Sequence, residues 1–96
     1  MRIGLCVEAD GRAGALRRLL AALAAQRFRD RPEPEGLVII VDVSAESELR
    51  EVVATARDGF RWELEYVAER ESQEARRKGI ALALARGADA VAFLEA

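Results

Sequence analysis

The sequence predicts an α/β protein in which a four-stranded parallel sheet lies between two layers of helices. Four short apolar segments alternate with three segments of helical periodicity, an order typical of successive β-α-β units. Hydrophobic residues make up 51% of the chain and charged residues 33%, a balance typical of a folded domain rather than a disordered segment. A length of 96 residues suits one core, so we expect a single domain over residues 1–96.

The four apolar segments are the predicted strands, and they cover residues 3–7, 37–41, 62–67 and 90–94. The first and second are continuously apolar, as strands covered on both faces must be. The fourth is also continuously apolar and has the pattern of an interior strand. The third alternates, with Trp62, Leu64 and Tyr66 on one face and glutamates on the other, a pattern typical of an edge strand. We therefore predict the strand order 3-2-1-4 with right-handed crossovers, in which the third strand forms one edge of the sheet.

Three amphipathic segments are the predicted helices, and they cover residues 13–27, 45–57 and 73–86. Leucine and valine side chains recur on one face of the first two, at the spacing of a helix that covers a sheet. The third helix faces inward through Ala75, Gly79 and Ala83, small residues that permit close packing, and we expect Leu84 to face inward as well. The spacing of Phe93 on the fourth strand predicts a core position.

The charge and residue composition exclude several functions. Lys and Arg number 15 against 17 for Asp and Glu, so the net charge of −2 gives no basic surface for nucleic acid or an anionic membrane. The chain has no His and one Cys, which excludes histidine zinc ligands, Ser-His-Asp triads, Cys-His nucleophiles and intramolecular disulfides. No segment has the pattern of a secretion signal or the length of a membrane span, so we expect a cytoplasmic protein.

Three sequence motifs accompany the predicted elements. They are Val41-Asp42-Val43-Ser44 after the second strand, Ala75-Arg76-Arg77-Lys78-Gly79 in the third helix and Phe93-Leu94-Glu95-Ala96 at the fourth strand. With this layout the chain resembles the N-terminal, nucleotide-sugar-binding half of a family 2 glycosyltransferase with the GT-A fold. The corresponding family motifs are Val-Asp-Asp-Gly-Ser, Ala-Arg-Asn-x-Gly and Phe-Leu-Asp. The resemblance implies a three-layer, Rossmann-like half-domain in which Asp42 and Arg76 remain from a nucleotide-binding site.

The chain departs from this family where the family's chemistry lies. Val43 stands where the family has a second Asp that contacts uracil, and Ala9 stands where it has a Thr that helps to hold the base. Glu95 and Ala96 replace the Asp-X-Asp motif that binds Mn²⁺ or Mg²⁺ through oxygen ligands. The resemblance places the acceptor-binding half and its general base beyond Ala96. We therefore expect no catalytic residue, no cofactor and no glycosyl transfer by this chain.

The same residues raise two alternatives to an inactive half-domain. In the first, another chain completes a residual nucleotide-sugar-binding part of a family 2 glycosyltransferase, and only then do a UDP-sugar and Mn²⁺ or Mg²⁺ bind. In the second, Glu8 and Asp10 after the first strand indicate a receiver-like phosphoacceptor. The receiver-like interpretation fails because the third strand ends in Val67-Ala68-Glu69, without an Asp to accept phosphate. An engineered module and an excised natural fragment both fit the pattern of replaced motifs.

Acidic side chains collect at the carboxyl ends of the predicted strands, where ligands bind in open α/β sheets. With the order 3-2-1-4, the strand order reverses between strands one and four, and Asp10, Asp42 and Glu95 follow strands one, two and four. A divalent-cation site shared by these three carboxylates is one interpretation. Solvated carboxylates that favour helix N-termini are the interpretation that we prefer.

The fourth strand predicts self-association. The segment from Ala90 to Leu94 contains no Pro and no charged residue, so it lacks the features that protect an edge strand from pairing. Two copies could pair their fourth strands antiparallel about a twofold axis and cover Phe93 and Leu94. We expect a homodimer or concentration-dependent self-association through this strand.

Overall fold

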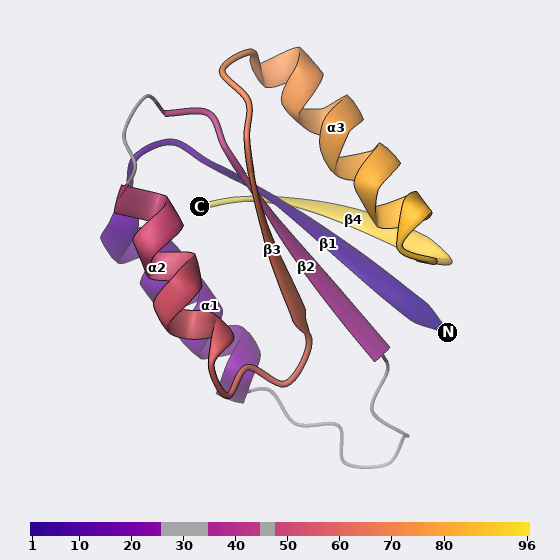
Figure 1. The fold of residues 1–96 in the computed structure, drawn as a ribbon, viewed down its shortest axis with the longest axis horizontal. Coiled ribbons are helices and arrows are strands. Elements are labelled where there is room, and N and C mark those ends of the chain that lie inside the picture. The colour runs from indigo at the N-terminus through magenta and orange to yellow at the C-terminus, as the bar shows by residue number, and fades with distance from the viewer. Residues whose placement is uncertain (26–34, 45–47) are drawn as a thin grey trace.

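All seven predicted elements are present in the computed structural model, which describes residues 1–25, 35–44 and 48–96 (Figure 1). Along the chain they are β1 (Arg2–Ala9), α1 (Ala13–Ala25), β2 (Glu35–Asp42), α2 (Glu48–Arg57), β3 (Glu63–Ala68), α3 (Ser72–Ala85) and β4 (Ala90–Glu95). The strands are parallel and lie in the order β3-β2-β1-β4, which confirms the predicted topology. The predicted helix boundaries at residues 27 and 45 lie outside the described residues.

The sheet separates two hydrophobic cores, one on each face. α1 and α2 cover one face and α3 covers the other (Figure 1). The leucine and valine stripes of α1 and α2 pack against Val7, Val38 and Ile40, whereas Cys6 and Ile39 lie under α3. Alternate residues of a strand face opposite sides, so β1 and β2 contribute to both cores. This explains why both strands are continuously apolar in sequence.

The small residues of α3 let this helix approach the sheet closely, as predicted. A Cβ atom at Gly79 would lie 3.1 Å from Sγ of Cys6 on β1, and a Cβ atom at Gly4 would lie 3.0 Å from Cβ of Ala83. Larger side chains at these positions would push the helix away from the strands. Gly87 follows the helix with a φ of +87°, a left-handed conformation that glycine adopts without strain.

Two side chains that the sequence pattern placed in the core lie at the surface. Phe93 on β4 is 40% exposed and Leu84 on α3 is 57% exposed, so both predictions are wrong. The physical reason is the position of α3, which packs mainly on β1 and β2 and covers β4 only in part, at Val91 and through the Arg76 side chain. Trp62 and Tyr66, by contrast, are half-buried and pack against the core under α1 and α2.

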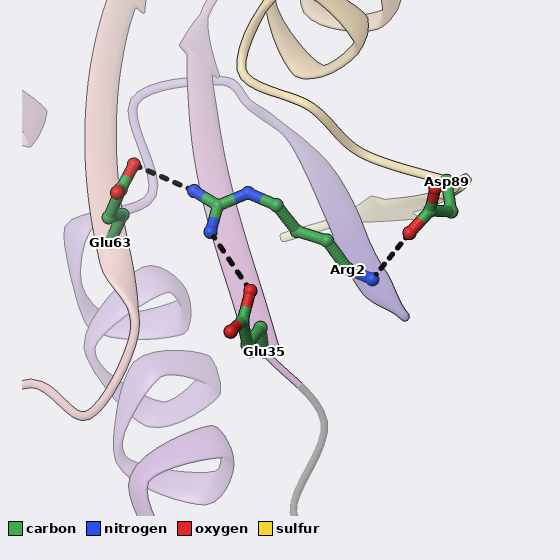
Figure 2. Close-up of polar contacts among 4 residues, drawn as sticks. All are labelled: Arg2, Glu35, Glu63 and Asp89. Carbon is green, nitrogen blue, oxygen red and sulfur yellow. Dashed lines mark hydrogen bonds and ion pairs between the residues drawn. The ribbon is translucent and has the colours of Figure 1, made fainter.

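Arg2 connects the strands at the amino end of the sheet (Figure 2). Its guanidinium group lies 3.0 Å from the carboxylate of Glu63 on β3 and 3.8 Å from that of Glu35 on β2. Its backbone N–H donates to Oδ2 of Asp89, just before β4, at 2.8 Å. The Arg2 side chain is only 21% exposed, and the two glutamates balance its charge across three neighbouring strands.

Candidate functional site

An open cavity lies where the strand order reverses, at the carboxyl ends of β1 and β4. Its volume is about 430 Å³, and its lining residues are Glu8, Asp10, Arg12, Val43, Arg70, Ser72, Glu95 and Ala96. β1 and β4 position the two glutamates, the turn into α1 positions Asp10 and Arg12, and the segment before α3 positions Arg70. Because ligands bind at such a switch point in open α/β sheets, this cavity is the candidate site.

The cavity is lined by more acidic than basic side chains. Glu8, Asp10 and Glu95 are opposed by Arg12 and Arg70. Oε1 of Glu8 accepts a hydrogen bond of 2.5 Å from the hydroxyl of Ser72, the first residue of α3. An anionic ligand would therefore be attracted by two guanidinium groups and repelled by three carboxylates.

Asp42, the predicted nucleotide-binding relic at the end of β2, is 1% exposed and is not among the lining residues of this cavity. Its Oδ1 accepts two hydrogen bonds from Ser44, one from the backbone N–H at 2.9 Å and one from the hydroxyl at 2.5 Å. Its Oδ2 accepts a hydrogen bond of 2.5 Å from the phenol of Tyr66 on β3. Both carboxylate oxygens are thus bonded within the domain.

Tyr66 is held in its neutral, hydrogen-donating form by the same arrangement. Burial raises the pKa of the Tyr66 phenol, and the hydrogen bond to Asp42 and its negative charge raise this pKa further. Arg50, whose guanidinium carbon lies 5.3 Å from the centre of the Tyr66 ring, acts in the opposite direction. The Tyr66–Asp42 pair therefore joins β3 to β2 by a hydrogen bond to a buried carboxylate.

The three carboxylates considered as cation ligands are not brought together. Asp10 and Glu95 line the cavity, whereas Asp42 points its oxygens at Ser44 and Tyr66. Within residues 1–25, 35–44 and 48–96, no group of three or more Cys, Asp or Glu side chains is placed to hold a metal ion. The described geometry thus offers no preformed site for the cation interpretation.

Arg76, the other predicted nucleotide-binding relic, lies over β4. Its guanidinium carbon is 5.8 Å from the centre of the Phe93 ring. A second cavity, of about 390 Å³, is lined by Glu8, Arg76, Phe93, Leu94 and Glu95. Asp42 lines neither cavity, so the two residues that the resemblance assigns to one nucleotide site have different surroundings.

The contact between Asp42 and Tyr66 was not predicted from the sequence. In the register of β2 and β3, Tyr66 lies opposite Ile40 and Ala68 lies opposite Asp42. Tyr66 is therefore one diagonal step from Asp42 on the same face, within reach of a long side chain. The predicted strand order, combined with the polar ends of these two side chains, was the signal that could have revealed the contact.

The one cysteine offers no nucleophile to the candidate site. Cys6 is 1% exposed beneath α3, and burial raises the pKa of its thiol, which keeps the thiolate scarce. In the described part of the chain, no helix is both long enough and apolar enough to cross a membrane. No family model matches the chain, and no curated protein or solved structure matches it either.

Proposed function

We propose that residues 1–96 are a glycosyltransferase-like α/β half-domain that folds by itself, binds no nucleotide sugar and transfers no sugar. The main observation in support of this proposal is that the carboxylate of Asp42 is buried and already hydrogen-bonded within the domain. Asp42 is 1% exposed, and both of its carboxylate oxygens accept hydrogen bonds from Ser44 or Tyr66. A nucleotide would have to displace these donors, and displacement would cost the free energy of their bonds to a charged group.

The residue that follows Asp42 supports the same proposal. Val43 lines the 430 Å³ cavity with an apolar side chain. A base N–H at this position would need an oxygen or nitrogen acceptor, and valine offers none. The cavity therefore presents no side chain at Val43 that could recognise uracil.

Transfer of a sugar also requires stabilisation of the diphosphate that leaves. Enzymes supply this with a metal ion or with positive groups placed at the developing charge. In the candidate cavity, Arg12 and Arg70 are outnumbered by Glu8, Asp10 and Glu95. This balance of charge supports a domain without transferase activity.

The second candidate function is the nucleotide-sugar-binding part of an enzyme that another chain completes. The observation that favours it is the position of Arg12 and Arg70 at the switch point of the sheet. Guanidinium groups bind phosphate oxygens well, and Asp10 and Glu95 in the same cavity could share Mn²⁺ or Mg²⁺ with a bound diphosphate.

Titration of UDP and of a UDP-sugar, each with Mg²⁺, into ¹⁵N-labelled protein distinguishes the two candidates. We expect no saturable shift of the backbone amides of Asp42, Ser44 or the cavity-lining residues at millimolar ligand. Saturable shifts that the Arg12→Ala/Arg70→Ala variant loses, but the Arg18→Ala control retains, would contradict our proposal and support the second candidate. Arg18 is exposed on α1 and does not line the cavity.

An activity assay tests the catalytic part of the proposal. We expect a panel of UDP-, GDP- and TDP-sugars with Mn²⁺ to give no more product or free nucleotide than the reaction without protein. Product formation above that background, proportional to protein concentration, would overturn the proposal.

A further inference from the structure

β4 forms an edge of the sheet, and no strand of the described part of the chain pairs with its outer side. It pairs with β1, while α3 packs mainly on β1 and β2. Phe93 is 40% exposed and Leu94 is 38% exposed. The register places Phe93 beside Cys6 on the face of α3 and Leu94 beside Val7 on the face of α1 and α2. Both faces of the strand are therefore accessible.

The backbone of β4 also presents unpaired groups along this edge. The N–H of Ala96 donates to the carbonyl of Glu8 at 3.0 Å, which shows that even-numbered residues of β4 face β1. Residues of a parallel strand alternate in the side to which their N–H and C=O groups point. Val91, Phe93 and Glu95 therefore point theirs away from β1, where only water or another strand can satisfy them.

α3 extends the exposed apolar surface beside Phe93. Arg76 lies over the Phe93 ring, which identifies the side of the helix next to β4. Ile80 and Leu84 follow Arg76 at intervals of four residues and so lie on that same side. Leu84 is 57% exposed. The edge of β4 is thus bordered by apolar side chains of the strand and of the helix.

Charge does not protect this edge. Residues from Ala90 to Leu94 carry none, and the register with β1 runs without a bulge to Glu95. Asp89, which precedes the strand, accepts the backbone N–H of Arg2, and Glu95 lines the same cavity as Arg76. Charged residues, Pro and bulges are the usual protection of edge strands, and β4 has none of them between Ala90 and Leu94.

We propose that a second copy of this chain occupies the edge, with the two β4 strands antiparallel about a twofold axis at Phe93. In this register Phe93 pairs with Phe93 of the second copy, and Val91 pairs with Glu95 of the second copy. Each outward-pointing residue then meets another outward-pointing residue, so their N–H and C=O groups bond to one another. The two sheets become one continuous sheet.

We propose a second copy as the partner because the edge is symmetric. The outward-pointing residues are centred on Phe93, so a twofold rotation brings the edge onto itself with every such group paired. Each Glu95 meets a valine rather than the other glutamate, and the two Phe93 rings form a favourable cross-strand pair. On the opposite face, Leu94 meets Ala92 of the second copy.

The interface consists of one strand edge and the side of one helix from each copy. Stable complexes bury about 1,200 Å² or more in total, and a single strand edge is small by that standard. We therefore expect a reversible dimer that dissociates on dilution. This inference does not depend on nucleotide binding, so the titration described above can fail or succeed independently of it.

Sedimentation equilibrium over a hundredfold range of concentration tests the association. We expect the average mass to rise from that of the monomer toward that of the dimer and then to level off. A monomer mass at every concentration, or a mass that continues to grow beyond the dimer, would overturn the proposal.

A pair of charge variants tests the register. Phe93→Lys and Phe93→Glu each place like charges opposite one another across the axis, so each variant alone should be monomeric where the wild type is dimeric. An equal mixture should dimerise, because Lys then meets Glu. Ala81→Lys, at an exposed position of α3 on the side away from the sheet, is the control and should dimerise like the wild type. A mixture that stays monomeric would rule out pairing at Phe93.

Amide exchange of the unmodified protein provides a test that does not depend on how the variants fold. We expect the amides of Val91, Phe93 and Glu95 to exchange more slowly at high protein concentration than at low concentration. The amides of Ala92 and Leu94 face β1 and should exchange equally at both. A dimer whose Val91, Phe93 and Glu95 amides gain no protection would show that the copies meet elsewhere.

Discussion

β3 and β4 are both edge strands of one parallel sheet, yet among the described residues charged side chains bond to the outer carbonyls of β3 and none bonds to those of β4. Nε of Arg57 donates to the carbonyl of Leu64 at 3.0 Å, and Nζ of Lys78 lies 3.4 Å from the carbonyl of Ala68. The register with β2 points both carbonyls outward, because the N–H of Glu69 donates inward to Asp42. In the part of the chain that the structure describes, side chains from two helices thus occupy the place of a further strand at β3 but not at β4.

β3 is also held by more side-chain interactions than β4. Ion pairs join Glu63 to Arg2 and Glu65 to Arg86, each at 3.0 Å. Before the strand, the indole of Trp62 fills the space that a side chain at Gly36 on β2 would need. We expect, therefore, that substitutions at β3 change the free energy of unfolding more than comparable substitutions at β4.

Gly36→Ala should have the largest effect. Its Cβ would overlap the Trp62 indole, so either the ring or β3 must move, and we expect a loss of about 2–3 kcal/mol in the free energy of unfolding. Gly14→Ala on α1 is the matched control, because its Cβ would meet only the flexible end of Arg18 at 3.5 Å. Urea denaturation should show the control unchanged or more stable by up to about 1 kcal/mol. Equal effects at both glycines would mean that Trp62 does not anchor β3.

Tyr66→Phe should have the next largest effect. It removes the hydrogen bond to Oδ2 of Asp42 and leaves that oxygen buried without this donor. We expect a loss of about 1.5–2 kcal/mol. Leu94→Ala on β4 is the comparison, measured at concentrations where the protein is monomeric, and its partly exposed side chain should cost less than about 1 kcal/mol. A larger loss at Leu94 would reverse the ranking of the two edges.

The hydrogen bond between Tyr66 and Asp42 should also make the free energy of unfolding depend on pH, with a smaller effect than the substitutions above. The pKa of Tyr66 is raised in the folded state, so between the unfolded and folded pKa values the folded protein binds more protons. The contribution of Tyr66 to stability is therefore fully present below its unfolded pKa of about 10 and is lost as the pH rises through the folded pKa. Tyr66 is the only tyrosine, so tyrosinate absorbance reports it directly. Asp42→Asn should lower the pH midpoint of the tyrosinate absorbance change. The control, Glu74→Gln, should not.

Removing the cations that cover the β3 edge should have the smallest effect on stability. Arg57→Met and Lys78→Met should each change the free energy of unfolding by about 0.5 kcal/mol or less, because both side chains are exposed at the surface. The double variant uncovers the carbonyls of Leu64 and Ala68 and should gain a second mode of self-association. Light scattering of this variant in the Phe93→Lys background, with Arg77→Met as the control, isolates that effect. If it remains monomeric, these two cations do not protect β3.

The two edges also show how far the sequence predicts the fold. Alternation of Leu64 and Tyr66 with glutamates predicted an edge strand correctly, because one face of β3 packs on the core and the other pairs with Arg2 and Arg86. The uninterrupted apolar run of β4 has the pattern of an interior strand, yet the predicted order 3-2-1-4 correctly places this strand at an edge, and Phe93, predicted in the core by its spacing, is exposed there. An apolar run does not distinguish a strand covered by helices from one whose neighbour is another molecule.

The candidate site was less predictable than the sheet order. The position of Asp42 at the end of a strand followed from the pattern, but its bonds depend on the register of β3 and on the rotamer of Tyr66, neither of which local sequence specifies. Arg76 was placed on the correct helix, yet its contact with Phe93 depends on the lateral position of α3 over the sheet. Tertiary packing decides both cases.

Because Gly79 packs closely over Cys6, the reactivity of the single thiol can report the motion of α3 away from β1. Cys6 is the only cysteine and is 1% exposed, so a disulfide reagent reaches it only when the helix lifts from β1. Where labelling outpaces reclosing, its rate equals the opening rate of that layer; where reclosing is faster, it reports the free energy of opening. Such a measurement would follow the layer under α3 without an introduced cysteine, while Tyr66 and Trp62 report on the opposite layer.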